Sequence, residues 1–215
     1  MTEPAVLAFP ALTALPGVRH GFICRVPGLD VAVQRDAALA RLSETHRSLL
    51  QGAGLPPLRQ AEQVHGPELA VVTAASPVVA GRVDALATQD PGITLGIYVA
   101  DCCAIFLVDP HRNAIGLVHS GKKGTADNIA GRSVRAMVDA FGAEPAGMVA
   151  QLSPCIRPPE YEVDFAAQIR GQLAAAGVGS VFDCGQNTAS DRTRYYSYRM
   201  ERGKTGRMLA YLALG

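Results

Sequence analysis

The chain has 215 residues, of which 48% are hydrophobic and 18% charged, and its formal net charge is +1. This length fits one large domain or two very small ones, and the composition supports a sizeable core and excludes global disorder. A net charge near zero gives no general attraction to nucleic acid or to an anionic membrane, so any electrostatic function must be local.

The predicted elements follow from apolar runs and turn residues. In chain order they are a strand at 17–26, a helix at 36–54, two short strands in 61–73 around a turn at Gly66–Pro67, a buried strand at 93–100, a hairpin of 104–108 and 114–118 around "DPHRN", a helix capped by Thr125 and ended by Gly142, a helix at 162–177, and a tail at 194–214 with a strand, a basic turn and a final helix or strand. Interspersed strands and helices indicate a mixed α/β or α+β class.

No apolar stretch is long enough to span a bilayer. The first eighteen residues contain Glu3 and three prolines and lack a basic segment, so they do not resemble a signal peptide. The five cysteines are odd in number and irregularly spaced, which disfavours a disulfide framework. We therefore expect a cytoplasmic protein with reduced thiols that serve as core residues, ligands or nucleophiles.

The predicted hairpin brings a thiol and an imidazole together. If Asp109 faces Asn113, then His119 faces Cys103, and with a loop one residue longer His119 faces Cys102. Directly opposed side chains share one face of a sheet, with Cβ atoms about 5 Å apart. Adjacent residues point to opposite faces, so the register alone does not choose between the two cysteines.

A metal site is one interpretation of this pair. His65 lies in "QVHG", at a turn after a strand, from which it can reach the same pocket. Two histidines and one cysteine form a zinc site whose fourth position is open to water or substrate. Asp101 lies at the end of a buried strand, where a carboxylate needs a partner. The alternative is a small buried cysteine beside a hydrogen-bonded structural histidine.

A candidate anion site follows the hairpin. The segment "HSGKKGT" leads from a strand into a helix start, where backbone N–H groups and the helix dipole favour an anion. A charge-assisted hydrogen bond from Lys122 or Lys123, of roughly 1.5–3 kcal/mol, exceeds the ~0.3–1 kcal/mol of the dipole. The glycine spacing excludes a Walker A loop, and the alternative is a solvated basic turn.

These motifs resemble the laccase-domain, or YfiH-like, family, and the likeness covers nearly the whole chain in the same order. The matching segments are "GFICR" with Arg25, "QVHG" at 63–66, "ADC" at 100–102, "HSGKKGT" at 119–125, "YEV" at 161–163, "SYR" at 197–199 and "TGRM" at 205–208. The resemblance implies one domain over residues 1–215, built as a sandwich of mixed sheets covered by helices.

The resemblance also implies a site and an activity. Zinc would be held by His65, Cys102 and His119, which selects Cys102 and the longer hairpin loop. The implied activity is a purine nucleoside phosphorylase acting on adenosine, inosine, guanosine and methylthioadenosine, in some members with adenosine deaminase activity. Asp101 would lie beside the metal. The expected partners are a nucleoside and phosphate, and neither nucleic acid nor a membrane; the oligomeric state stays open.

Two departures from the family bear on the substrates. Lys122 and Lys123 stand where the family commonly has Trp-Arg, and they would contact phosphate with help from Arg25 or Arg199. The chain has no Trp, so purine stacking falls to Tyr or Phe. Three alternatives are a metal-free hydrolase or deamidase with a Cys102–His119 pair, a copper-dependent oxidase, and a non-catalytic nucleoside-binding homologue. Five histidines are too few for a multicopper cluster with a separate copper site.

Overall fold

The computed structural model describes residues 3–215. Its elements are β1 (Val6–Leu7), α1 (Pro10–Thr13), β2 (Val18–Ile23), α2 (Arg35–Gly52), β3 (Leu58–Ala61), β4 (Leu69–Val71), β5 (Val79–Ala80), β6 (Ala85–Thr88), β7 (Thr94–Val99), β8 (Cys103–Asp109), β9 (Ala114–Ser120), α3 (Lys122–Ala126), α4 (Ile129–Phe141), a 3-10 turn (Pro145–Gly147), β10 (Val149–Leu152), α5 (Phe165–Ala175), β11 (Ser180–Asp183) and β12 (Met208–Leu214). The mixed α/β class expected from the sequence is confirmed.

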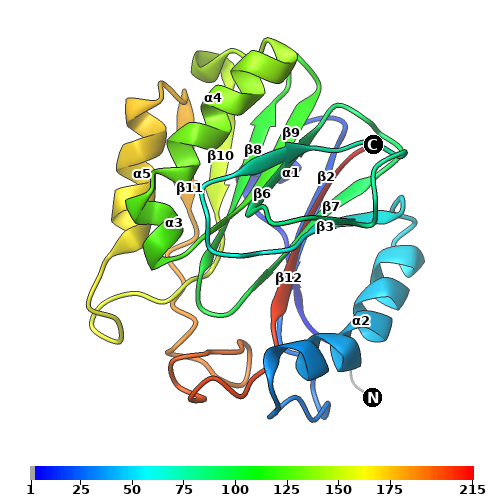
Figure 1. Ribbon diagram of the computed structural model, residues 1–215, viewed down its shortest axis with the longest axis vertical. Coiled ribbons are helices and arrows are strands. Elements are labelled where there is room, and N and C mark those ends of the chain that lie inside the picture. Colours follow the sequence, from blue (N-terminus) through cyan, green and yellow to red (C-terminus); the bar gives the residue numbers. More distant parts are fainter. Residues whose placement is uncertain (1–2) are drawn as a thin grey trace.

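The strands form two six-stranded sheets (Figure 1). Sheet A has the order β1-β2-β12-β7-β3-β5, and sheet B has the order β11-β10-β8-β9-β6-β4. Both sheets are mixed, because β3 pairs in parallel with β5 and β7, β4 with β6, and β10 with β11, whereas the other pairs are antiparallel. In the part of the chain that the structure describes, no helix is both long and apolar enough to cross a membrane.

The main core fills the space between the two sheets. Phe22 and Leu212 of sheet A meet Phe106 and Leu117 of sheet B in one buried cluster. The outer face of sheet B packs against α4 and α5, and the outer face of sheet A packs against α2. Helices therefore cover the outside of a two-sheet sandwich, as expected from the family resemblance.

Strands β8 and β9 are buried along their whole length because both of their faces are covered. Along β8, Ala104 and Phe106 point into the core between the sheets, whereas Cys103 and Ile105 point toward the helices. Cys102 precedes β8 and packs on the same side as Ala104. The two adjacent cysteines thus face different layers of the molecule, as the period of a strand requires.

The hairpin register differs from both expected registers. Asp109 pairs with Ala114, and His119 therefore faces Ala104 rather than either cysteine. Asn113 stays in the turn with a left-handed backbone (φ 48°), and the Asp109 carboxylate accepts hydrogen bonds from backbone N–H groups within the turn. Because these bonds fix the turn, the register shifts by one residue from the expected pairing of Asp109 with Asn113. Cys102 thereby becomes the diagonal neighbour of His119.

Two other local expectations were wrong. The long helix after the hairpin is capped by Asn128, whose side chain accepts from Gly131 N–H, and Thr125 instead lies inside the short helix α3. Thr125 exchanges a hydrogen bond of 2.8 Å with Ser120. The tail contains no strand before β12, because residues 191–206 form hydrogen-bonded turns. Gly142 ends α4 in a left-handed conformation, as expected.

Candidate metal centre

Three segments that are distant in sequence bring the expected ligands together. His65 lies in the turn after β3, Cys102 lies where the chain passes from β7 of sheet A to β8 of sheet B, and His119 lies on β9. Their ligand atoms all lie within 4.8 Å of one another. The rings of His65 and His119 are nearly perpendicular, with centroids 4.8 Å apart. One small ion could contact the three side chains at once after slight adjustment.

Asp84, which the sequence analysis missed, organises the two histidines. This fully buried carboxylate precedes β6. It accepts a 2.7 Å hydrogen bond from His119 Nδ1 and also accepts from the backbone N–H groups of Val64, His65 and Gly66. Burial favours the neutral acid, but these bonds outweigh it and hold the pKa of Asp84 below its usual value.

The contacts of Asp84 leave His119 Nε2 free to face the cluster. They also fix the turn in which His65 adopts a left-handed backbone, with φ 61°. A metal-bound histidine nearly always donates its other ring N–H to a carboxylate or carbonyl. That rule, applied to the acidic residue at the start of the apolar run "VDALA", was the one sequence signal that could have pointed to Asp84.

The thiol and the imidazole form a charged pair in the metal-free protein. Burial favours the neutral thiol, but the charge and hydrogen bonds of His119 and His65 outweigh it and lower the pKa of Cys102 to about 6. Burial likewise opposes the charge on His119, but Cys102 and Asp84 raise its pKa to about 9. A thiolate beside an imidazolium is therefore the expected state at neutral pH.

Gly121 makes room for the cluster. A Cβ atom at this position would lie 2.5 Å from Cys102 Sγ and 3.8 Å from His65 Cδ2. Any side chain here would displace the thiol, so the glycine between Ser120 and Lys122 is needed by the site itself.

The donor set fits a single ion better than a copper cluster. Two imidazoles and a thiolate suit Zn²⁺, and they leave its fourth position open. The other histidines lie elsewhere: His20 accepts from Phe9 N–H, His46 stacks on Tyr98, and His111 lies in the hairpin turn. No methionine lines the cleft beside the cluster among residues 3–215.

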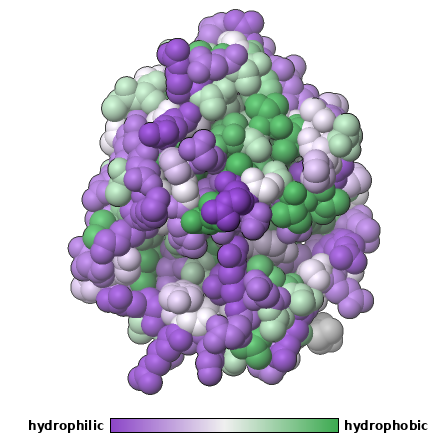
Figure 2. Space-filling view, viewed as in Figure 1, coloured by the Kyte–Doolittle hydropathy of each residue, from purple (hydrophilic) through white to green (hydrophobic). Residues whose placement is uncertain are grey.

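The cluster lies in the wall of a cleft of about 870 Å³. Tyr98, Tyr161, Phe165 and Tyr198 line this cleft together with the three ligands. Aromatic faces of this kind can hold a flat heterocycle. The start of α2 and the turns before β12 lie in the lower part of the view in Figure 1. Figure 2, seen from the same side, shows hydrophilic residues over much of that region.

Asp101 lines the cleft and fixes a neighbouring loop. Its carboxylate accepts from Thr188 Oγ1 at 2.6 Å and from the backbone N–H of Arg199 at 2.9 Å. Asp101 is buried, so its carboxylate has the partners that the sequence analysis expected it to need. It ties the loop before β12 to the strand end that carries Cys102.

Of the expected anion contacts, the structure brings Lys122 and Arg199 to the cleft. Both are exposed, and both form ion pairs with Glu162, at 3.2 Å and 3.5 Å. Lys123 pairs instead with Asp127 one helical turn along and does not line the cleft. This is a correction for Lys123, whose side chain leaves α3 in another direction.

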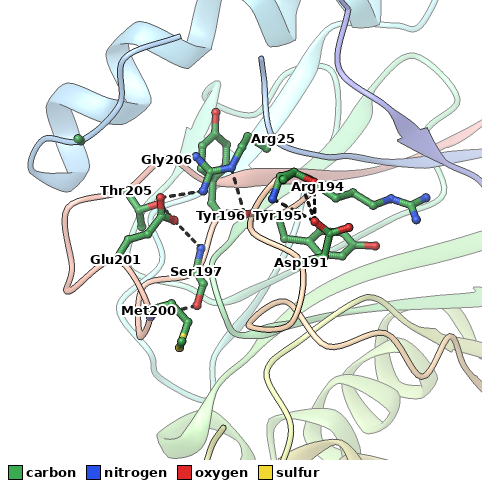
Figure 3. A network of polar contacts seen from close by, with 12 residues as sticks. Arg25, Asp191, Arg194, Tyr195, Tyr196, Ser197, Met200, Glu201, Thr205 and Gly206 are labelled. Atoms are coloured by element: carbon green, nitrogen blue, oxygen red, sulfur yellow. Dashed lines mark hydrogen bonds and ion pairs between the residues drawn. The ribbon is translucent and has the colours of Figure 1, made fainter. Parts of the chain in front are cut away.

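Arg25 is a second correction. Its guanidinium forms a 2.7 Å ion pair with Glu201, donates to the Tyr195 carbonyl and lies 4.3 Å from the centre of the Tyr196 ring. Glu201 in turn accepts from Ser197 N–H and Thr205 Oγ1 (Figure 3). Arg25 therefore holds the turns before β12 together and does not line the cleft.

The cleft has further basic residues to which the sequence analysis gave no role. They are Arg35 at the start of α2, and Arg202, Lys204 and Arg207 in the segment before β12. Arg207 belongs to the "TGRM" segment, so its position was marked by the motif although its function was not.

The fold and the cluster define a mixed α/β protein with a candidate single-ion site in a basic, aromatic-lined cleft. Residues 19–167 and 162–215 match the family described as multi-copper polyphenol oxidoreductase laccase. The chain belongs to this family, and the resemblance seen in its motifs is thereby confirmed.

Named relatives carry a different description. The chain is 32% identical to a purine nucleoside phosphorylase of Deinococcus radiodurans, over 92% of this chain and 89% of the relative. It is 30% identical to one of Xylella fastidiosa, over 99% and 94%. The crystal structure of YfiH from Bacillus licheniformis is similar in fold, with a TM-score of 0.86 at 21% identity, covering 99% of this chain and 97% of that one.

Proposed function

We propose that this protein is a zinc-dependent purine nucleoside phosphorylase. The observation that carries the proposal is the cluster of His65, Cys102 and His119 in the wall of an aromatic, basic cleft. In this cleft a metal ion, a purine and an anion could bind side by side. The names of relatives at 30–32% identity support the same activity. The candidate nucleosides are adenosine, inosine, guanosine and methylthioadenosine.

The reaction exchanges one bond at the sugar. An oxygen of hydrogen phosphate forms a bond to C1′ while the bond from C1′ to the purine nitrogen breaks and its electron pair goes to the purine. The proton that phosphate loses passes to the leaving base, and the products are the free base and the sugar 1-phosphate, which is ribose 1-phosphate except for methylthioadenosine, whose sugar keeps its methylthio group. The tyrosines of the cleft would hold the purine, and the basic side chains would hold phosphate against the sugar.

The protein's own residues would set the geometry. His65, Cys102 and His119 would hold zinc, which when bound supplies a Lewis acid that orients the substrate or polarises it. Asp84 would keep both imidazoles aimed at the ion through the hydrogen bonds described above. Asp101 would hold the loop that carries Arg199 against the cleft.

The test is a nucleoside panel incubated with zinc-loaded protein, with and without phosphate, and analysed by chromatography of the products. The expected result is release of free base together with the corresponding sugar 1-phosphate only when phosphate is present. The incubation without phosphate also measures conversion of adenosine to inosine, which is the adenosine deaminase activity implied by the family resemblance. Base release that does not depend on phosphate would contradict the proposal.

A metal-free cysteine hydrolase is the second candidate, because the pKa of Cys102 is lowered to about 6 beside His119. It predicts turnover that survives zinc removal and stops on alkylation of Cys102. Nucleoside binding without turnover would instead favour a non-catalytic homologue. A copper oxidase predicts oxidation of phenols by the copper-loaded protein.

We also propose one domain over residues 1–215 and a cytoplasmic location. Strands from both ends of the chain pair within sheet A, since β2 and β12 are neighbours. The five cysteines form no disulfide, which fits a reducing compartment. Limited proteolysis that yields no stable fragment, and fractionation of cells, test the two proposals.

A further inference from the structure

Arg207 is a buried charge without an acidic partner. Only 8% of the residue is exposed, yet it lines the cleft directly before β12. Its Nη1 donates to the carbonyls of Thr205 and Gly206, both at 2.9 Å. Among residues 3–215 it forms no ion pair and its Nε and Nη2 atoms donate no hydrogen bond, although its Cζ lies 5.7 Å from the centre of the Tyr198 ring. Buried charged groups usually have a paired charge, and leaving one unpaired costs free energy.

A second positive group lies nearby without an acidic partner. Arg35 is the first residue of the 18-residue helix α2, and it lines the same cleft. Its Nη1 donates to the Gln63 carbonyl at 3.3 Å, and no carboxylate pairs with it in the part of the chain described. Burial and the charge of Arg35 both lower the pKa of Arg207, so the cleft disfavours the charge of Arg207 until an anion neutralises it.

Three other basic residues of the region already have acids, whereas Arg202 and Lys204, which also line the cleft, form no ion pair among residues 3–215. Arg25 pairs with Glu201, and Lys122 and Arg199 share Glu162. The negative groups near Arg207 are Cys102 and Asp101, but neither forms an ion pair or a hydrogen bond with it. Bound zinc would offset the charge of the Cys102 thiolate and leave Arg207 still less compensated.

We propose that Arg207, assisted by Arg35 and the start of α2, forms the binding site for the phosphate co-substrate. The Nε–Nη2 edge of a guanidinium can donate two parallel hydrogen bonds to two oxygens of one tetrahedral anion. The first N–H groups of an α-helix add further donors for an anion. This inference rests on the proposed function and names the residues that would hold its second substrate. Lys122 and Arg199 would act at the mouth of the cleft.

The test is a calorimetric titration of zinc-loaded protein with orthophosphate, without nucleoside. We expect Arg207→Met to weaken phosphate binding about ten- to a hundredfold, which is the value of one charge-assisted contact. Arg35→Met should weaken it less, about three- to tenfold, because this side chain is exposed. The control Arg132→Met removes an exposed charge from α4 and should leave the affinity unchanged. Zinc content should be the same in all four proteins.

Unchanged phosphate affinity in both Arg207→Met and Arg35→Met would overturn the inference, as would an absence of phosphate binding by the wild type. If Arg207→Met does not fold, Arg35→Met decides alone, because that residue lies at the surface. A parallel titration with ribose 5-phosphate separates the sources of the anion. Binding of the ester without binding of orthophosphate would also contradict the inference.

The activity assay separates this inference from the proposed function. Phosphorolysis by Arg207→Met with a wild-type KM for phosphate would refute the phosphate site and leave the function standing. Conversely, phosphate binding that is lost in Arg207→Met, in a protein that cleaves no nucleoside, would keep the anion site and refute the function.

Discussion

At the scale of the residue, one buried carboxylate determines the geometry of the candidate metal centre. Asp84 accepts from His119 Nδ1 and from three consecutive backbone N–H groups, at Val64, His65 and Gly66. Both histidines of the cluster therefore depend on a residue that would not touch a bound metal. Replacing such a residue in other metal sites typically lowers metal affinity ten- to a hundredfold.

We expect Asp84→Asn to lower zinc affinity by about that factor. Only the oxygen of an amide accepts hydrogen bonds, whereas the carboxylate of Asp84 accepts with both oxygens from four donors. Competition with a chromogenic chelator measures the affinity. Asp139→Asn, an exposed residue on α4, is the matched control and should bind zinc as the wild type does. Equal zinc affinity in Asp84→Asn and the wild type would show that the turn keeps its shape without this carboxylate.

Cys102 should be the reactive thiol of the metal-free protein. Its pKa is lowered to about 6, so the thiolate predominates above that pH and is lost as the pH falls through it. The pKa of the fully buried Cys103 is raised, so this thiol should stay unreactive at neutral pH. We expect the rate of alkylation of Cys102 by iodoacetamide, followed by mass spectrometry, to level off above pH 7 and to fall sharply once zinc is bound. A rate that still rises tenfold per unit toward pH 9 would indicate an ordinary thiol.

At the scale of the element, strand period and turn chemistry decide which side chains meet. The sequence correctly placed β7, β8, β9, α2, α4 and α5, because their apolar patterns are long and end at clear turn residues. It missed β1, α1, β5, β6, β10 and β11, which are too short for an apolar pattern to stand out. The predicted hairpin register was wrong by one residue. Asn113 stays in the turn, in which the Asp109 carboxylate accepts hydrogen bonds from backbone N–H groups.

Site residues that belong to a recognisable sequence motif could be predicted. Residues whose role depends on a hydrogen-bond or ion-pair partner elsewhere in the fold could not. His65, Cys102 and His119 come together as expected. Arg25 and Lys123 looked like anion contacts because their positive charge is visible in the sequence. Their acidic partners, Glu201 and Asp127, become apparent only in the fold. Asp84 was missed for the same reason.

Gly121 offers a test at this scale, since it links β9 to α3. A Cβ atom here would lie 2.5 Å from Cys102 Sγ, so we expect Gly121→Ala to displace the thiol and weaken zinc binding at least tenfold. The control Gly171→Ala has open space around it within α5. That change should leave zinc binding intact and stabilise the fold by about 0.5–1 kcal/mol. Chelator competition and thermal unfolding measure the two effects, and unchanged zinc affinity in Gly121→Ala would contradict the close contact.

At the scale of the whole molecule, the cluster lies where the two sheets are joined. His65 follows a strand of sheet A, His119 lies on sheet B, and Cys102 is on the segment that passes from one sheet to the other. An ion bound by all three would cross-link the sheets. Its binding should therefore stabilise the fold, apart from any part it has in the proposed reaction.

We expect zinc at a thousandfold excess over its Kd to stabilise the folded state by about 4 kcal/mol, which corresponds to roughly 10 °C in Tm for a chain of this size. Differential scanning calorimetry with zinc and with a chelator measures the difference. Cys102→Ala should show little response to either. If the chelator does not change the Tm of the zinc-treated wild type, the cluster does not bind zinc in a way that stabilises the fold.

The most direct test of the account is the release of free base from a purine nucleoside by zinc-loaded wild type, Cys102→Ala and Cys103→Ala, each with and without phosphate. The account predicts phosphate-dependent release by the wild type and by Cys103→Ala, with one zinc per chain in both. It predicts that Cys102→Ala loses both zinc and turnover. Phosphate-dependent release by a metal-free Cys102→Ala protein, or no phosphate-dependent release by the zinc-loaded wild type, would contradict it.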